Sequence, residues 1–216
     1  MASSKPILHS YFRSSCSWRV RAALALKGID YEYRAVNLLK TDQLSDAYTA
    51  LNPQGQVPSL QIDGVLMTQS LPIIEYLDET RDGVSILPKD PLQRYSTRRL
   101  AEIINAGIQP LQVQNLSMLK FVGPERKMEL GNSVITKGFK ALEKILETTS
   151  GKYCVGDEVT LADLFLVPQV YNANRFNVDM KEFPTISRVN DALSTLEAFK
   201  VSHPHVQPDC PEDLRQ

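Results

Sequence analysis

A run of three hydroxyl side chains and one thiol, Ser14-Ser15-Cys16-Ser17, lies between a strand-like segment and a segment with helical spacing. The start of a helix has backbone N–H groups without partners and the positive end of the helix dipole. It therefore favours an anion, and a thiolate is one. Arg13 and Arg19 add positive charge on either side. The sequence thus predicts a site that holds a sulfur anion, either its own or that of a ligand.

The elements that position this run follow a strand-and-helix pattern. Residues 6–11 have the pattern of a short half-buried strand, and Val20, Ala23 and Leu24 predict a helix that stops at Gly28. Further along, residues 31–37 resemble a strand and residues 43–50 favour a helix. Two short strands at 59–62 and 65–67, joined by Asp63-Gly64, predict a hairpin. A helix then begins at Ser70, with Leu71, Ile74 and Leu77 on its apolar face. The order β-α-β-α-β-β-α predicts an α/β domain whose helices cover a parallel pair of strands and an antiparallel hairpin.

Beyond a linker rich in glycine, proline and charge, the pattern of the chain is helical. The predicted helices are 92–108, 126–148, 161–176 and 185–199, and residues 203–216 are expected to lie along the surface without regular structure. Thr160 and Asp163 form a capping box, to which we assign a structural role. The predicted division is an N-terminal domain at 1–83, a linker at 84–91 and an all-helical C-terminal domain at 92–216.

The composition argues against several classes of function. The 216-residue chain has a formal net charge of −1, so it has no strong basic field to attract nucleic acid or an anionic membrane. Its apolar runs are too short to span a bilayer, and its N-terminus has no signal-like hydrophobic segment. The three cysteines, Cys16, Cys154 and Cys210, form no disulfide framework or zinc-like pattern, so we expect no metal and a reducing, cytoplasmic location. Cys154 is expected to be a small buried hydrophobe, Cys210 has no evident role, and no histidine is assigned one.

Two further short motifs favour recognition of a peptide-like ligand. Pro58 comes just before a strand; if its peptide bond is cis, the Val57 backbone is turned outward and can pair with an extended peptide, although cis is the minority form. Gln69 and Ser70 place an amide and a hydroxyl at another helix start, which suits a carboxylate. The alternative for Ser70 is a plain helix cap.

Together these motifs resemble the glutathione transferases over nearly the whole chain, with a thioredoxin-like domain followed by an all-helical one. The segment Ser14–Arg21 is similar to the signature of the zeta class, whose members are also known as maleylacetoacetate isomerases. Other segments that match the class are Ile108-Gln109-Pro110-Leu111, Asn115-Leu116-Ser117, Asn174-Arg175-Phe176, 153–158 and Pro168-Gln169-Val170.

The resemblance implies roles for individual residues, with glutathione as the cofactor. Ser14 would hydrogen-bond the glutathione sulfur, with Ser15 and Cys16 beside it as catalytic residues. The residues implied to bind glutathione are Ser14, Ser15, Cys16, Ser17, Trp18, Arg19, Gln43, Val57, Pro58, Gln69, Ser70, Gln109, Asn115, Leu116 and Ser117. The substrate carboxylates would be met by Arg13, Arg19 and Arg175. The stretch Gln112-Val113-Gln114 is two residues longer than the class pattern, which weakens the Asn115 and Ser117 assignments.

The implied reaction is the glutathione-dependent cis–trans isomerisation of maleylacetoacetate to fumarylacetoacetate in tyrosine and phenylalanine catabolism. Glutathione transferase activity and dehalogenation of α-haloacids such as dichloroacetate are implied as well. The family also implies a homodimer in the cytoplasm and leaves a minor mitochondrial pool open. Cys16 is the ambiguous residue, because a thiol at a helix start is itself a potential nucleophile. Two rival interpretations remain: a general transferase that consumes glutathione, and a non-catalytic module with the same fold.

Overall fold

The computed structural model describes residues 5–112 and 121–215. Its contacts divide the chain into two compact units, Met1–Val84 with Glu197–Gln216, and Ser85–Leu196. The largest difference from the predicted division is that the C-terminal segment, Glu197–Gln216, groups with the first unit and not with the helices before it. The predicted linker at 84–91 is divided between the two units at Val84.

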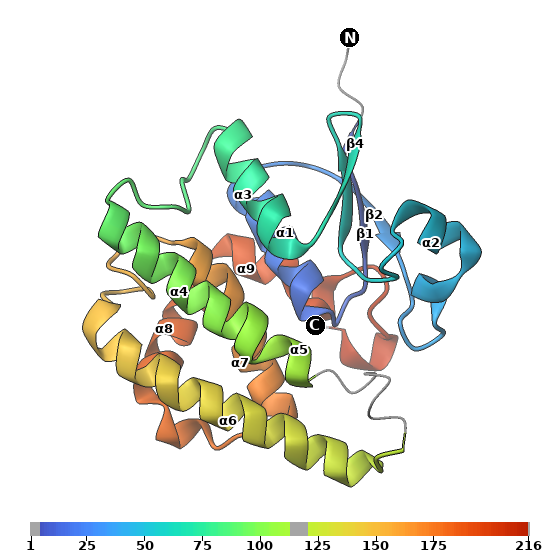
Figure 1. The fold of residues 1–216 in the computed structure, drawn as a ribbon. Helices are drawn as coiled ribbons and strands as arrows, with labels where there is room; N and C mark the ends of the chain where they lie inside the picture. Colours follow the sequence, from blue (N-terminus) through green and yellow to red (C-terminus); the bar gives the residue numbers. More distant parts are fainter. Residues whose placement is uncertain (1–4, 113–120, 216) are drawn as a thin grey trace. The chain divides into compact units, whose positions relative to one another are not determined.

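The first unit is built on a four-stranded mixed sheet (Figure 1). The strands β1 (Ile7–Ser10), β2 (Glu32–Ala35), β3 (Ser59–Ile62) and β4 (Val65–Thr68) lie in the order β2-β1-β3-β4. β1 runs parallel to β2, and β3 is antiparallel to both β1 and β4. Asp63 and Gly64 both have positive φ, 53° and 77°, as a two-residue hairpin turn requires. The predicted order of strands and helices is confirmed.

Three helices of the first unit follow the strands: α1 (Ser15–Leu26), α2 (Asp46–Leu51) and α3 (Ser70–Thr80). α1 and α3 pack against each other, and Leu24, Leu60 and Ile74 are fully buried in the core. The predicted apolar face of α3 needs one correction. Ile73 is buried beside Ile74 and Leu77, whereas Leu71 is half-buried because it lies in the first turn of the helix.

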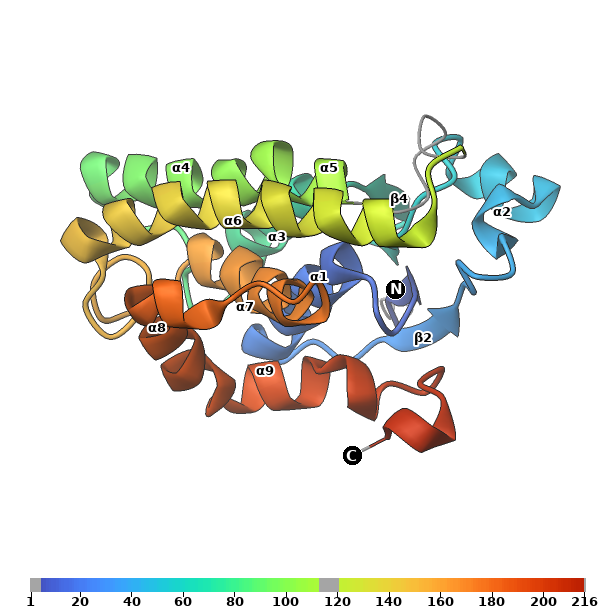
Figure 2. The same cartoon turned by 90° about the horizontal axis from the view of Figure 1, so that it is seen from below.

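The C-terminal segment has more structure than the sequence indicates. The predicted helix 185–199 is in fact two helices, α8 (Pro184–Ser194) and α9 (Glu197–Ser202), and α9 packs on α1 (Figure 2). The prediction of an irregular surface path for 203–216 holds only in part, since residues 211–215 are exposed but others are buried. Short 3₁₀ turns form at η4 (Pro204–Val206) and η5 (Glu212–Leu214), and Cys210 is buried. The physical reason is a distant partner: Cys210 packs with two aromatic residues, Tyr11 and Phe12.

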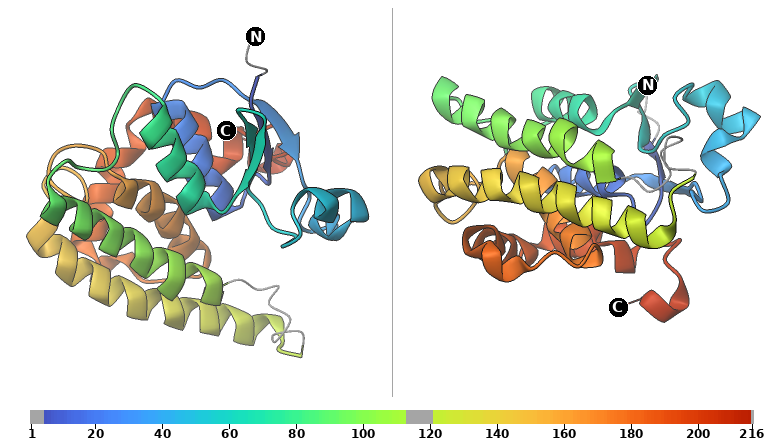
Figure 3. Two further views of the ribbon diagram at one scale, coloured as in Figure 1. Left: turned by 45° about the horizontal axis from the view of Figure 1, so that its top comes forward. Right: turned by 60° about the horizontal axis from the view of Figure 1, so that its bottom comes forward.

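The second unit is helical, as predicted. It contains α4 (Pro91–Gly107), α5 (Gln109–Gln112), α6 (Pro124–Thr149), α7 (Leu161–Arg175), the 3₁₀ turn η3 (Met180–Glu182) and α8. α4 and α6 lie side by side in both views of Figure 3, and α4 also packs on α7, most of whose residues are buried. The short helix α5 was not predicted.

The capping box of α7 is present and confirms the structural role of Asp163. The Asp163 carboxylate accepts hydrogen bonds from the Thr160 N–H at 2.7 Å, the Thr160 hydroxyl at 2.9 Å and the Cys154 N–H at 2.9 Å. Cys154 is buried as expected, and burial raises the pKa of its thiol. Among residues 5–112 and 121–215, no helix is long and apolar enough to cross a membrane. In the same ranges, no group of three metal-ligating side chains is arranged around a common point.

The junction between α9 and η4 contains a histidine that is held neutral. Burial, His205 and Arg21 lower the pKa of His203 to about 4 from its ordinary value of 6.5. Its ring lies edge-on to Trp18 at 5.1 Å, and its Nδ1 accepts from the His205 N–H at 3.2 Å.

This environment makes stability depend on pH. Because unfolded His203 binds a proton near pH 6.5 and folded His203 only near pH 4, protonation favours the unfolded chain between these values. The free energy of unfolding should therefore fall as the pH drops from about 6.5 to about 4. His203→Phe, which keeps an aromatic ring, should make the fall smaller. Urea unfolding across this range tests the expectation, and parallel curves for the two proteins would contradict it.

Candidate active site

The start of α1 is capped by Ser14, the residue predicted to meet sulfur. Its side-chain oxygen accepts from the Ser17 N–H at 3.2 Å, and its carbonyl accepts from the Trp18 N–H at 2.9 Å. The cap uses the Ser14 oxygen as an acceptor and leaves its hydroxyl hydrogen to donate. Ser15 and Cys16 begin the helix, where backbone N–H groups have no carbonyl one turn earlier. One hydroxyl and two N–H groups are thus placed to bind an anion.

The side chains of the predicted run separate into two groups. Ser14 and Cys16 are half-buried, and the Cys16 thiol is free. Ser17 and Trp18 point into the interior, with 0 % and 3 % of their surface exposed, and the Trp18 indole N–H donates to Ser202 Oγ at 2.9 Å. Side-chain contacts with a ligand are therefore open to Ser14 and Cys16 at this helix start, whereas the side chains of Ser17 and Trp18 are packed in the interior.

Arg19 lies in α1, and its side chain reaches the first residue of α3. It is fully buried, and its Nη1 donates to Ser70 Oγ at 3.2 Å. Ser70 is the first residue of α3 and follows Gln69, whose φ is 70°. The Gln69 side chain is exposed and donates to Gln54 Oε1 at 2.6 Å. The sequence-based role of Arg19 as a substrate cation remains untested, but its guanidinium lies at the α3 start.

The backbone segment that leads into β3 is fixed by hydrogen bonds from two side chains. The Val57–Pro58 peptide bond is cis, the form that the resemblance implies. The Gln56 carbonyl accepts from the Tyr48 hydroxyl at 2.7 Å and from Asn52 Nδ2 at 2.8 Å. These two bonds fix the backbone immediately before Val57. Neither Tyr48 nor Asn52 was singled out from the sequence, because no local pattern joins them to Gln56.

Gln43 supplies an acceptor to the same region. Its Oε1 atom is buried and has no hydrogen-bond partner among the described residues. A buried amide oxygen without a donor is costly, so a ligand N–H would satisfy it. The Gln43 backbone is in turn close to Gly55, where an added Cβ would lie 3.0 Å from the Gln43 carbonyl oxygen.

The other predicted site residues lie elsewhere in the chain. Arg13 is half-buried, with its guanidinium 5.7 Å from the centre of the Phe12 ring. In the second unit, Gln109 is half-buried at the start of α5, and Arg175 is exposed at the end of α7, where its Nη1 donates to Asn172 Oδ1 at 3.2 Å. The predictions for Asn115, Leu116 and Ser117 lie outside the described residues.

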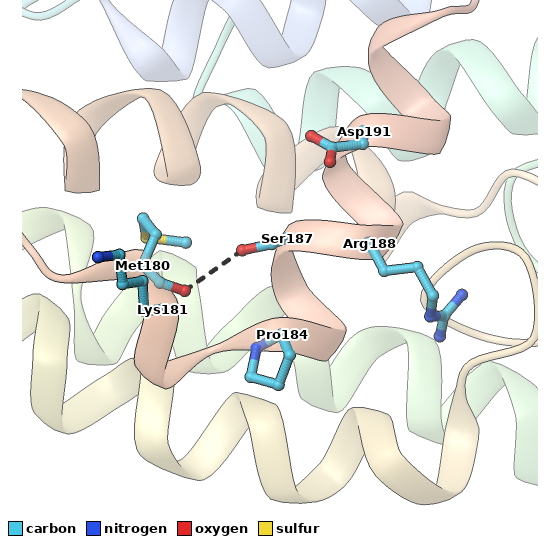
Figure 4. A pocket seen from close by; sticks show the side chains of 6 residues that line it. All are labelled: Met180, Lys181, Pro184, Ser187, Arg188 and Asp191. Carbon is cyan, nitrogen blue, oxygen red and sulfur yellow. Dashed lines mark hydrogen bonds between the residues drawn. The ribbon is translucent and has the colours of Figure 1, made fainter.

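A pocket in the second unit is unrelated to these residues. Figure 4 shows it beside η3 and α8, with Ser187 Oγ donating to the Met180 carbonyl at 3.4 Å. Arg188 lines it and donates to the Gly151 carbonyl and Ser150 Oγ. The full lining is Met180, Lys181, Pro184, Ser187, Arg188 and Asp191. Because none of these was a predicted ligand residue, we place the candidate active site at the starts of α1 and α3.

Comparisons with known proteins identify the family of this chain. Residues 13–80 match the model of the glutathione S-transferase N-terminal domain, and residues 116–200 match that of the C-terminal domain. The chain is 58 % identical to a maleylacetoacetate isomerase of Mus musculus over 100 % of both chains. A solved maleyl pyruvate isomerase, described as a bacterial zeta-class glutathione S-transferase, superposes with a TM-score of 0.92 at 39 % identity, covering 95 % of this chain and 100 % of that one.

One more solved relative carries ligands. The maleylacetoacetate isomerase of Anaeromyxobacter dehalogenans, solved with glutathione in its active site, is 44 % identical with a TM-score of 0.87, over 96 % of this chain and 98 % of that one. A second structure of that protein holds dicarboxyethyl glutathione and citrate. The chain described here belongs to the glutathione S-transferase family, within its zeta class. It is an enzyme whose cofactor is glutathione.

The surroundings of Gly55 allow a test of the Gln43 assignment. Gly55→Ala places a Cβ against the Gln43 carbonyl and the Leu44 side chain, at a left-handed φ of 58°. We expect a stability loss of about 1–2 kcal/mol from the φ alone, and displacement of Gln43 should raise the Kd for glutathione roughly fivefold. Urea unfolding and calorimetric titration measure the two effects.

Gly28→Ala is the matched control. Its φ is 63°, but nothing lies within 4 Å of the added Cβ. It should lose similar stability and keep its glutathione affinity. Equal affinity changes in the two variants would show that Gln43 does not contact the ligand.

Proposed function

We propose that this enzyme catalyses the glutathione-dependent cis–trans isomerisation of maleylacetoacetate to fumarylacetoacetate. The observation that carries the proposal is the start of α1, where the Ser14 cap leaves a hydroxyl hydrogen and the first N–H groups of the helix to an anion. The mouse and bacterial relatives named maleylacetoacetate isomerase support the choice of substrate.

The residues of the first unit fit glutathione. The buried Gln43 Oε1 lacks a donor, and a peptide-like ligand has N–H groups to offer. Ser70 Oγ accepts from Arg19, so its hydroxyl hydrogen is left for the γ-glutamyl carboxylate, with the buried guanidinium behind it. We therefore propose that Arg19 acts on the cofactor through Ser70, and that the substrate carboxylates are met by Arg13 and Arg175.

When bound, glutathione supplies a thiolate that adds reversibly to the double bond, so that the bond is single while it rotates. A cysteine-like thiol has a pKa of about 8.5, so at neutral pH the protein must favour its ionised form. A hydrogen bond from Ser14 to a charged sulfur is worth about 1.5–3 kcal/mol, or one to two pKa units. The positive end of α1 adds to this effect.

Substitutions at the start of α1 test this mechanism. With maleylacetone as a stable surrogate substrate, the enzyme should form trans product while the glutathione concentration stays constant. Ser14→Ala should lower kcat/KM about tenfold to a hundredfold, since one charge-assisted hydrogen bond is lost. Cys16→Ala should retain most of the activity, because the reacting thiol belongs to glutathione.

The opposite pattern of activities in these two variants would identify a different nucleophile. If Cys16→Ala abolished the reaction and Ser14→Ala did not, the protein's own thiol would be the nucleophile. Consumption of glutathione without trans product would identify a general conjugating transferase.

Arg175→Ala separates isomerisation from conjugation. Its planar guanidinium suits a carboxylate, so its loss should lower kcat/KM for the dicarboxylate roughly tenfold or more. Conjugation of a neutral electrophile should change little. Arg188→Ala, an exposed arginine in the same unit, is the matched control and should leave both reactions unchanged. An equal loss in both reactions for Arg175→Ala would exclude a role specific to the substrate carboxylate.

The same thiolate supports two further activities that we include in the proposal. Displacement of halide from an α-haloacid such as dichloroacetate needs a nucleophile and a cation for the carboxylate, and we assign these roles to the glutathione thiolate and to Arg13 and Arg175. Conjugation of electrophiles needs the thiolate alone. Chloride release from dichloroacetate, measured with wild type and Ser14→Ala, tests the first activity; release that is independent of Ser14 would argue against it.

The remaining proposals concern the oligomeric state, the metabolic role and the location of the enzyme. We propose a homodimer, supported by two apolar side chains of α4, Leu92 and Tyr95, which are 76 % and 59 % exposed. Sedimentation velocity decides this, and a monomer at micromolar concentration would exclude it. We also propose a role in tyrosine and phenylalanine catabolism in the cytoplasm, with a minor mitochondrial pool. Cell fractionation tests the location.

A further inference from the structure

The loop that leads into Ser14 is held at two consecutive residues, Tyr11 and Phe12. The Phe12 N–H donates to Asp209 Oδ2 at 2.9 Å, and its carbonyl accepts from Arg21 Nη2 at 3.0 Å. The Ser14 N–H donates to the neighbouring Tyr11 carbonyl at 3.0 Å, which also accepts from Arg21 Nη1 at 3.4 Å. The peptide groups just before Ser14 therefore lie between a carboxylate and a guanidinium.

Both charged groups are themselves fixed. Asp209 Oδ1 accepts from the Tyr33 hydroxyl at 2.6 Å, which ties it to β2. Arg21 is almost fully buried, and its Nε donates to the Ser202 carbonyl at 3.0 Å and its Nη1 to Ser10 Oγ at 3.1 Å. Because both groups are bonded to other elements of the first unit, together they constrain the position of the Phe12 peptide.

Apolar packing also holds the loop before Ser14. Tyr11, Phe12 and Cys210 form a buried cluster, against which Leu38 and Val57 pack. Val57 is the residue assigned to the cysteinyl backbone of glutathione. One cluster, to which the C-terminal segment contributes Cys210, thus contacts both places where the ligand is expected: the loop before Ser14 and the segment before β3.

We propose that Asp209 is a positioning residue for glutathione activation. By fixing the Phe12 peptide it places the Ser14 hydroxyl at the distance and angle that a hydrogen bond to the bound thiolate requires. This inference rests on the proposed role of Ser14. Hydrogen bonds weaken steeply with poor geometry, and small misplacements of catalytic groups have large effects on rate. The cap of α1 is local to the helix, whereas the path of the loop before it depends on a partner 197 residues away.

The test is the pKa of the enzyme-bound glutathione thiol, measured from thiolate ultraviolet absorbance during a pH titration. Asp209→Ala should raise that pKa by about one unit and lower kcat/KM at neutral pH about tenfold. Asp209→Asn should recover most of both, since an amide oxygen still accepts from the Phe12 N–H. Only a positioning role predicts recovery together with the shift.

A matched variant separates positioning from stability. Glu143 in the second unit also accepts backbone hydrogen bonds, from the Thr185 N–H at 2.7 Å and the Ile186 N–H at 2.9 Å. Glu143→Ala should lower the urea midpoint, as Asp209→Ala should, and leave the thiol pKa unchanged. A lower midpoint with an unchanged thiol pKa in Asp209→Ala would overturn the proposal.

The Ser14→Ala variant distinguishes failure of the Asp209 proposal from failure of the proposed role of Ser14. If Ser14→Ala raises the thiol pKa and Asp209→Ala does not, the positioning role fails and the role of Ser14 stands. If neither raises it, the proposed role of Ser14 fails as well. Should Asp209→Ala not fold, Tyr33→Phe loosens the carboxylate while keeping its bond to Phe12; it should give a smaller rise in thiol pKa, and no rise would count against the proposal.

Discussion

At the start of α1 the Ser14 oxygen accepts from the Ser17 N–H, and this cap determines which groups remain for a ligand. It satisfies one of the helix's first N–H groups and leaves the Ser14 hydroxyl hydrogen and the N–H groups of Ser15 and Cys16. The same helix then positions two buried arginines. Since successive helical residues turn by about 100°, Arg19 and Arg21 point in different directions. One reaches the start of α3 at Ser70, and the other reaches the loop that precedes the cap.

Much of both units could be predicted because the signals are local. Asp63-Gly64 requires the two-residue turn that the structure contains, and Thr160 and Asp163 lie close enough in sequence to identify the cap of α7. The C-terminal segment could not be predicted in this way. Its polar, proline-rich sequence is typical of an irregular surface segment. Cys210 is a core residue only because it packs with Tyr11 and Phe12. The break between α8 and α9 has the same origin, because helical spacing continues in the sequence while the packing partner changes.

The candidate site shows a similar limit. Residue types at helix starts identify Ser14 and Ser70, since hydroxyls there have a defined use. Residue type does not give the direction of a side chain. Arg19 has the charge expected of a substrate cation, but its guanidinium lies in the interior against Ser70. Arg21 belongs to the same motif and received no role from the sequence, although it donates to four groups around the loop. Asp209 had no local signal at all.

The first unit consists of two stretches of chain separated by Ser85–Leu196, so the helical unit is in effect an insertion within it. During synthesis the β1–α1 loop leaves the ribosome long before Asp209 does. Until then the Phe12 N–H lacks its carboxylate, and the Tyr11 and Phe12 rings lack the cover of Cys210. The order of translation therefore makes the loop before Ser14 one of the last parts of the molecule to reach its final form, although it is among the first to be made.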